Sequence, residues 1–127
     1  MEPRFLTAEQ VRNLHRQALE QHGGQDGLRD TAAFESAVVQ PQNVWIYGQG
    51  DLFEIAAAYA FHLAESQAFL DGNKRTGAAA ALTFLRVNGA TVPKNTNEIY
   101  SAMIGLANRT VSKPELAKLL RRLSKGS

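Results

Sequence analysis

Two long apolar segments constrain the fold of this chain more than any other feature. Residues 52–64 and 73–88 are both rich in alanine and in larger apolar side chains, and neither has a wide polar face. A helix that is apolar on nearly all sides usually lies at the centre of a bundle, with neighbours on several sides. We therefore expect two central helices, with the loop that joins them at one end of the core.

Start and stop signals predict further helices in the first third of the chain. Thr7-x-x-Gln10 is a capping box, in which each side chain satisfies a free backbone N–H group, and the glycine pair at 23–24 ends the helix that follows. Asp30 is a typical N-cap for a second, short helix. Because the residue before a proline is disfavoured in the helical conformation, we expect that helix to end before Pro41.

The last third of the chain carries similar signals. Gly89 follows the second long segment and suits the left-handed position just after a helix. Asn95-x-x-Glu98 and Ser112-x-x-Glu115 both have the capping-box pattern ahead of apolar residues at helical spacing. The whole chain therefore predicts about six helices.

Strand signals are almost absent. The one candidate is Asn43–Tyr47, which includes Trp45 and lies between a proline and the turn formed by residues 48–50. We expect this segment to form a short extended flap. The expected fold is all-α: a compact single-domain bundle, residues 1–127, of about six helices with that flap.

Composition excludes several classes of protein. Among 127 residues there is no cysteine, which rules out a disulfide scaffold, thiol catalysis and cysteine-ligated metal sites. No apolar run approaches the roughly 18–20 residues that cross a bilayer, and the start of the chain lacks a signal-peptide pattern, so we expect a cytoplasmic protein without a membrane partner. The net charge is only +2. The basic residues of the last helix therefore predict a solvated face, and a DNA-binding bundle is the weakest of the hypotheses.

The loop between the central helices has the composition of an anion site. Gly72 and Asn73 lie where the chain turns into a helix, so free N–H groups point outward there. Lys74 and Arg75 add two cations, and arginine can hold phosphate through two hydrogen bonds. Asp71 would repel phosphate unless a divalent cation lay between them, which is the usual arrangement of carboxylate, Mg²⁺ and phosphate. These residues indicate a nucleotide polyphosphate site with Mg²⁺.

An ordinary helix start explains the same residues. In that interpretation Asp71 caps the helix, Phe69 and Leu70 pack the loop onto the core, and the Lys-Arg pair is solvated. Taken alone, the residues favour neither interpretation.

The segment resembles the signature of the Fic/Doc family, which runs His, any residue, Phe, any residue, Asp or Glu, Ala or Gly, Asn, and then Gly-Arg or Lys-Arg. The matching residues are Phe69, Asp71, Gly72, Asn73, Lys74 and Arg75. The resemblance extends through HGGQDGLRD, ESAVVQPQ, DLFEIAAAYAFHLA and FLRVNG, and so covers most of the chain. It is strongest to the Doc branch, the short toxins of toxin–antitoxin pairs.

The resemblance implies a role for each residue of the loop. Asp71 would hold Mg²⁺, the Gly72–Asn73 turn would cradle phosphates, and Arg75 would bind phosphate oxygens. Family members with Gly-Arg mostly transfer AMP, whereas Doc-like members with Lys-Arg transfer the γ-phosphoryl group of ATP to a threonine of elongation factor Tu. Lys74 beside Arg75 therefore favours phosphorylation over AMP transfer, and with it a block of translation.

The resemblance also implies partners. Members of this branch are neutralised by a small antitoxin, and the translation factor is the target. The flap with Trp45 and Tyr47 would be the place where a target segment docks as an added strand.

The signature's leading histidine is replaced by Gln67. In the family this histidine accepts the proton of the attacking hydroxyl, and an amide cannot act as a base near neutral pH. His62 should point elsewhere on the same helix, and His15 and His22 are expected on the surface of the first helix. We therefore expect an inactive or attenuated enzyme, by natural degeneration or by an engineered change.

Two alternatives stay open. The chain would be a non-catalytic module that binds nucleotide or antitoxin on the same scaffold, or its parent activity would be AMP transfer. Ala78–Ala81, just after the loop, offer no polar side chain to a nucleotide, which weakens the expectation of tight ATP binding.

Overall fold

The computed structural model describes residues 2–126, so the expected outer bounds at residues 1 and 127 lie outside the described part of the chain. The helices within these residues are α1 (Ala8–His22), α2 (Thr31–Gly48), α3 (Leu52–Ser66), α4 (Asn73–Val87), α5 (Asn97–Ala107) and α6 (Lys113–Gly126). The β pairing in the described chain is limited to one isolated bridge between Leu28 and Phe69. The all-α prediction with about six helices is confirmed. None of the helices described is both long and apolar enough to cross a membrane.

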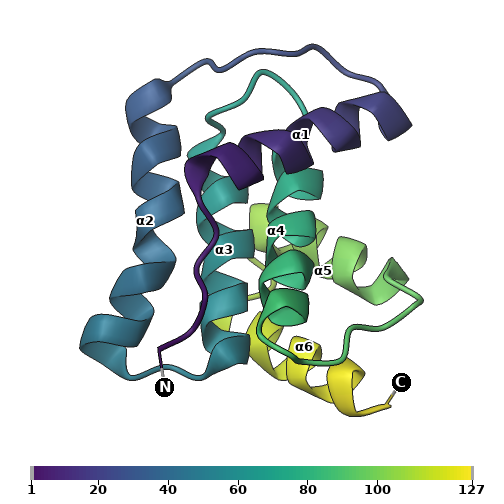
Figure 1. Ribbon diagram of the computed structural model, residues 1–127. Coiled ribbons are helices and arrows are strands. Elements are labelled where there is room, and N and C mark those ends of the chain that lie inside the picture. Colours follow the sequence, from purple (N-terminus) through teal and green to yellow (C-terminus); the bar gives the residue numbers. More distant parts are fainter. Residues whose placement is uncertain (1, 127) are drawn as a thin grey trace.

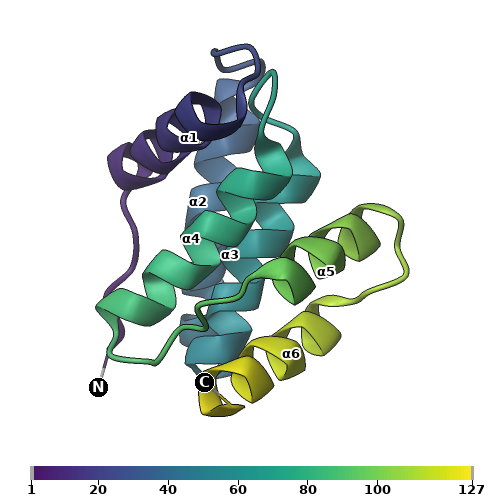
Figure 2. The ribbon, with the colours of Figure 1, turned by 90° about the vertical axis from the view of Figure 1, so that its right-hand side faces the viewer.

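Helices α3 and α4 form the centre of the bundle, as the two apolar segments predicted. They run antiparallel, with α1 and α2 on one side and α5 and α6 on the other (Figures 1 and 2). Small side chains allow the two axes to approach: Ala56, Ala60 and Ala80 are buried, and Gly77 lies directly against the backbone of Ala60. The loop that joins α3 to α4 is thereby placed at one end of the core.

Most of the predicted helix ends are confirmed by their hydrogen bonds. Thr7 and Gln10 form the reciprocal capping box of α1, and Ser112 and Glu115 form that of α6. Gly89 has φ +85° just after α4 and donates its N–H to the carbonyl of Arg86, as in a Schellman motif.

The capping box predicted at Asn95 and Glu98 is wrong. The N-cap of α5 is Thr96, and the side chain of Asn95 instead accepts the N–H of Asn97. An asparagine can satisfy a backbone N–H two residues on, which gives a local turn that precedes the helix by one residue.

Helix α2 does not end before Pro41 but continues through it to Gly48. Its buried face consists of Phe34, Ala37, Val38 and Pro41, and Val44 continues the same helical spacing as a partly buried residue. The proline costs one backbone hydrogen bond, and burial of its ring in the core offsets this loss. The spacing of the apolar residues therefore predicts the end of α2 better than the single proline does.

The predicted extended flap at Asn43–Tyr47 is also wrong, since these residues form the last turns of α2. Trp45 is partly buried against the core, whereas the side chain of Tyr47 is 83% exposed. Both lie near the start of α3, while the loop of interest follows its end, about 22 Å away for a helix of 15 residues. Docking of a target segment at Trp45 and Tyr47 stays a prediction, but these residues offer a helix and not a free strand edge.

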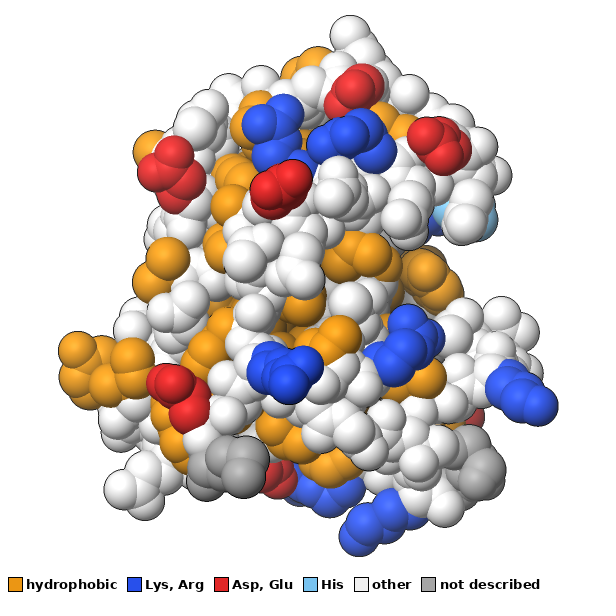
Figure 3. Space-filling view, viewed as in Figure 1, with side chains coloured by type: hydrophobic (Ala, Val, Ile, Leu, Met, Phe, Trp, Pro, Cys, Tyr) orange, Lys and Arg blue, Asp and Glu red, His pale blue; other side chains and the backbone are white. Residues whose placement is uncertain are grey.

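The basic residues of α6 are partly used in ion pairs. Arg121 pairs with Asp51, the N-cap of α3, and Arg122 pairs with Glu98 on α5. On the face shown in Figure 3, acidic and basic side chains mix in the upper half, whereas basic side chains predominate in the lower half.

The close approach at Gly77 predicts a specific cost for one added methyl group. A Cβ there would lie 2.7 Å from the carbonyl oxygen of Ala60 and 3.1 Å from the terminal methyl of Met103. We expect Gly77→Ala to lower the free energy of unfolding in urea by about 1–3 kcal/mol. Gly48→Ala is the matched control, because a Cβ at Gly48 meets open space, and it should be neutral or slightly stabilising. Equal stability of the two variants would contradict this helix contact.

Candidate functional site

The first turn of α4, which follows the loop after α3, lines an open cleft. Gly72 is the N-cap, in the left-handed conformation with φ +80°, which glycine adopts without strain. Within the described residues no side chain caps this helix. The first N–H groups of α4 therefore keep their capacity to bind an anion.

The Asn73 side chain fixes the conformation of the loop through two hydrogen bonds to the backbone. Its Oδ1 accepts the N–H of Phe69 and its Nδ2 donates to the carbonyl of the same residue, both at 3.0 Å. Because Phe69 is buried, these two hydrogen bonds fix the loop to the core. The contribution of Asn73 to an anion site would therefore come from its backbone, not from its amide.

His15 lies beneath this loop and is not on the surface, contrary to the prediction. It is 2% exposed, its Nε2 donates to the carbonyl of Asp71 at 2.8 Å, and its ring stacks on Phe69 with centroids 3.7 Å apart. Val11, His15 and Ala18 share the buried face of α1, and this spacing is visible in the sequence. His22 is exposed as predicted and lies at the rim of the cleft.

An extended segment flanks the loop, but it is residues 23–30 and not the predicted flap. The N–H of Leu70 donates to the carbonyl of Gly27 at 3.0 Å, and that of Arg29 donates to Ala68 at 2.7 Å. These bonds surround the bridge between Leu28 and Phe69. The segment HGGQDGLRD, which carried part of the family resemblance, is thus adjacent to the signature loop.

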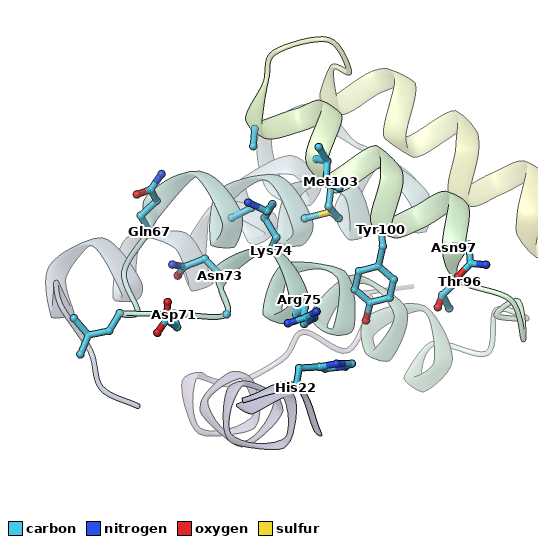
Figure 4. Close-up of a pocket in the computed structure, with 15 residues that line it drawn as sticks. His22, Gln67, Asp71, Asn73, Lys74, Arg75, Thr96, Asn97, Tyr100 and Met103 are labelled. Atoms are coloured by element: carbon cyan, nitrogen blue, oxygen red, sulfur yellow. The ribbon is translucent and has the colours of Figure 1, made fainter. Parts of the chain in front are cut away.

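The cleft brings together the residues that the sequence singled out. It has a volume of about 730 Å³ and lies between the start of α4 and one face of α5 (Figure 4). The predicted residues that line it are Gln67, Asp71, Gly72, Asn73, Lys74 and Arg75. On the opposite wall, α5 contributes residues that sequence reasoning had not selected: Thr96, Asn97, Tyr100, Met103 and Ile104.

Asp71 does not cap α4. Its Oδ2 accepts the N–H of Gln25 at 2.8 Å, so the carboxylate is held toward the flanking segment at the edge of the cleft. No group of three or more acidic or histidine side chains gathers anywhere in the described chain. A magnesium ion at Asp71 would need phosphate oxygens to complete its coordination, which is the common mode for nucleotide-bound Mg²⁺.

Gln67 is the exposed C-cap of α3, and Arg29 holds it. The Arg29 Nη2 donates to the backbone carbonyl of Gln67 at 2.8 Å and to its Oε1 at 3.3 Å. Arginine can only donate, so it engages the Gln67 Oε1, which keeps a second lone pair, and the NH₂ group stays a donor. Sequence reasoning missed Arg29, since nothing local connects residue 29 with residue 67.

His62 makes its contacts away from the loop. It packs edge-on against the ring of Phe61, and its Nε2 lies 3.3 Å from the Lys113 ammonium at the start of α6. Burial, and then the charge of Lys113, lower the pKa of His62 to about 4. The prediction that His62 points elsewhere is confirmed.

The sequence of the chain matches known proteins over the segment that contains the loop. Residues 5–85 match the model of the Fic/DOC family. The chain belongs to this family. It is 34% identical over 121 residues to the Protein kinase doc of Escherichia phage P1, covering 94% of this chain and 95% of that protein. It is 44% identical over 70 residues to the Toxin Doc of Mycolicibacterium smegmatis, about half of each chain. The chain therefore lies on the Doc-type branch of the Fic/DOC family.

The buried position of His15 gives a test of how the loop is held. His15→Ala removes the ring that stacks on Phe69 and the hydrogen bond to Asp71, so we expect the free energy of unfolding to fall by about 2–4 kcal/mol. His22→Ala, on the same helix but exposed, should change it by less than about 0.5 kcal/mol. Chemical unfolding of both variants measures the difference, and a neutral His15→Ala would show that the loop does not depend on this ring.

Proposed function

We propose that this chain is a Doc-type toxin whose parent activity is ATP-dependent phosphorylation of a translation factor, at a threonine of elongation factor Tu. We propose further that the chain as written is inactive or attenuated, because Gln67 stands where the family has its histidine. The observation that carries the proposal is the uncapped first turn of α4, which faces the cleft together with Lys74 and Arg75. The printed names of the relatives, a protein kinase and a toxin, support it.

In this proposal the phosphates of ATP lie on the first turn of α4. The backbone N–H groups and the positive end of the helix dipole attract the anion, and Arg75 adds a forked pair of donors. Asp71 would hold Mg²⁺, which when bound neutralises phosphate charge during transfer. His15 and Asn73 keep the loop rigid, and phosphoryl transfer depends mostly on such positioning.

The Lys74-Arg75 pair supports phosphoryl transfer over AMP transfer. Doc-like sequences with this pair transfer the γ-phosphoryl group, and the phage relative is named a protein kinase. AMP transfer is the alternative chemistry for the same loop, and the two differ in which phosphorus atom the target receives.

Gln67 accounts for the proposed loss of activity. The attacking hydroxyl must lose a proton as the bond to phosphorus forms, and the amide cannot take it. The Oε1 of the side chain receives a hydrogen bond from Arg29, which orients the amide. General-base catalysis contributes roughly 10²–10⁴-fold, which is enough to separate a toxin from a tolerated protein.

A non-catalytic binding module is the second candidate. The contact of Arg29 with Gln67 favours it, because it holds an amide, which takes no proton near neutral pH, at the position where catalysis needs a base. In this case the cleft would hold nucleotide or antitoxin without chemistry.

Restoring the base distinguishes the two candidates. We expect Gln67→His to transfer label from γ-labelled ATP to purified elongation factor Tu at a rate roughly 10²–10⁴-fold above that of the unmodified chain. Gln67→Asn is the matched control and should stay inactive, because it changes the side chain without adding a base. Transfer from α-labelled ATP instead would establish AMP transfer. If Gln67→His transfers neither label, the enzyme proposal is wrong and the non-catalytic binding module is the remaining candidate.

We also propose a small antitoxin as the partner of this chain, by similarity to the Doc toxins. A short disordered segment that folds on the toxin suits such regulation. Co-expression with the product of an adjacent short reading frame should give a complex that elutes as one species in size-exclusion chromatography. Separate elution of the two chains, or a gene without a short neighbour, would count against this partner.

A further inference from the structure

A second hollow in the surface adjoins the cleft at position 67. It has a volume of about 460 Å³ and lies between the end of α3 and the segment that joins α5 to α6. Ala64, Gln67 and Ala107 line both hollows, so they form the boundary between them. Position 67, where the family has its histidine, is therefore open to two separate spaces.

The two hollows differ in charge. The cleft is lined by a lysine, an arginine and one carboxylate. The second hollow instead has two carboxylates, Glu65 and Glu115, and one cation, Arg109. Its lining also includes partly buried Phe61 and buried Leu106, which offer apolar contact. A polyanion such as a nucleotide is favoured in the cleft, whereas the second hollow suits a segment that carries positive charge.

Glu65 is the carboxylate of this hollow that is left to bind another molecule. It is exposed in the last turn of α3, and its side chain makes no hydrogen bond or ion pair with any residue of the described chain. Glu115, by contrast, uses its Oε1 to accept the N–H of Ser112 at the start of α6. A cation from a bound protein can therefore pair with Glu65 without breaking a contact within the chain.

The chemistry of phosphoryl transfer requires a second approach to position 67. A bond from the attacking hydroxyl oxygen to phosphorus forms while the bond from phosphorus to the leaving oxygen breaks, and the two oxygens lie roughly in line. The hydroxyl must therefore arrive on the side of the phosphorus away from the leaving group, within reach of the base that takes its proton. This requirement is the same for either phosphorus atom.

The second hollow meets this requirement. The first turn of α4, from Asn73 to Arg75, lines the cleft and not the second hollow, which opens beyond Gln67. With phosphates on that turn, the second hollow is a space next to position 67 that the nucleotide leaves free.

We propose that this second hollow is the acceptor site, in which the target segment that carries the hydroxyl lies with one of its lysine or arginine residues beside Glu65. This inference rests on the proposed function, and it adds the surface that recognises the target and the charge of the residues around the hydroxyl. The chain as written suits a binding measurement, because Gln67 takes no proton and the bound target should stay unmodified.

Charge reversal at Glu65 tests the acceptor site. Biolayer interferometry measures the binding of purified elongation factor Tu to the immobilised chain, and calorimetry measures the binding of Mg·ATP to the same proteins. We expect Glu65→Lys to weaken the binding of elongation factor Tu by about 5- to 30-fold, because an attraction becomes a repulsion, and Glu65→Gln by about 2- to 5-fold. Binding of Mg·ATP should not change, since Glu65 does not line the cleft.

Glu20→Lys is the matched control. Like Glu65, this glutamate is exposed in the last turn of its helix, α1, and it lines neither hollow. The substitution makes the same change in net charge, so it should leave the affinity for elongation factor Tu as it is in the unmodified chain.

The outcomes separate the acceptor site from the proposed function. Equal affinity of Glu65→Lys and Glu20→Lys for elongation factor Tu would overturn the acceptor site and leave the proposed function intact. A parallel loss of Mg·ATP binding in Glu65→Lys would also overturn it, because Glu65 would then act through the cleft. If the unmodified chain binds Mg·ATP but not elongation factor Tu, the proposed target is wrong and the acceptor site fails with it.

Discussion

The close packing of α4 on α3 is the contact on which the rest of this structure depends. Alanines on α3 and Gly77 on α4 let the two backbones approach within van der Waals distance. Because the helices are adjacent and antiparallel, a short loop can join them, and its position at the end of the core follows directly. The candidate site is this loop and the first turn of α4, so the packing of small side chains positions the chemistry.

The loop itself is held from three sides. Within the loop, the Asn73 side chain hydrogen-bonds to the backbone of Phe69. From α1, His15 donates a hydrogen bond to the carbonyl of Asp71 and stacks on Phe69. The segment at 23–30 pairs with the loop through backbone hydrogen bonds. None of these contacts uses the cationic side chains or the free N–H groups of α4. The structure thus separates the residues that shape the loop from those left to bind an anion. Gln67 is held apart from these contacts, since Arg29 donates to its backbone carbonyl and to its side-chain oxygen.

Much of the fold could be predicted from local signals, because caps and apolar spacing act over a few residues. Both ends of α1 and the starts of α3, α4 and α6 follow this rule. The prediction failed where a tertiary contact outweighed a local preference: Pro41 continues α2 because its ring is buried in the core, and the same burial turned the expected flap into helix. The residues of the signature loop were found together in one cleft, yet the supporting His15 and Arg29 act across long sequence separations. Only the folded chain brings them to the loop.

The proposed function depends on the first turn of α4 as a phosphate site. Isothermal titration calorimetry with Mg·ATP, on the chain as written and on Arg75→Ala, tests it most directly. A charge-assisted hydrogen bond contributes about 1.5–3 kcal/mol, so we predict that Arg75→Ala weakens binding about 10- to 150-fold. Arg12→Ala, exposed on α1 and outside the cleft, should bind as the unmodified chain does. Identical heats for the chain and Arg75→Ala would contradict the phosphate site.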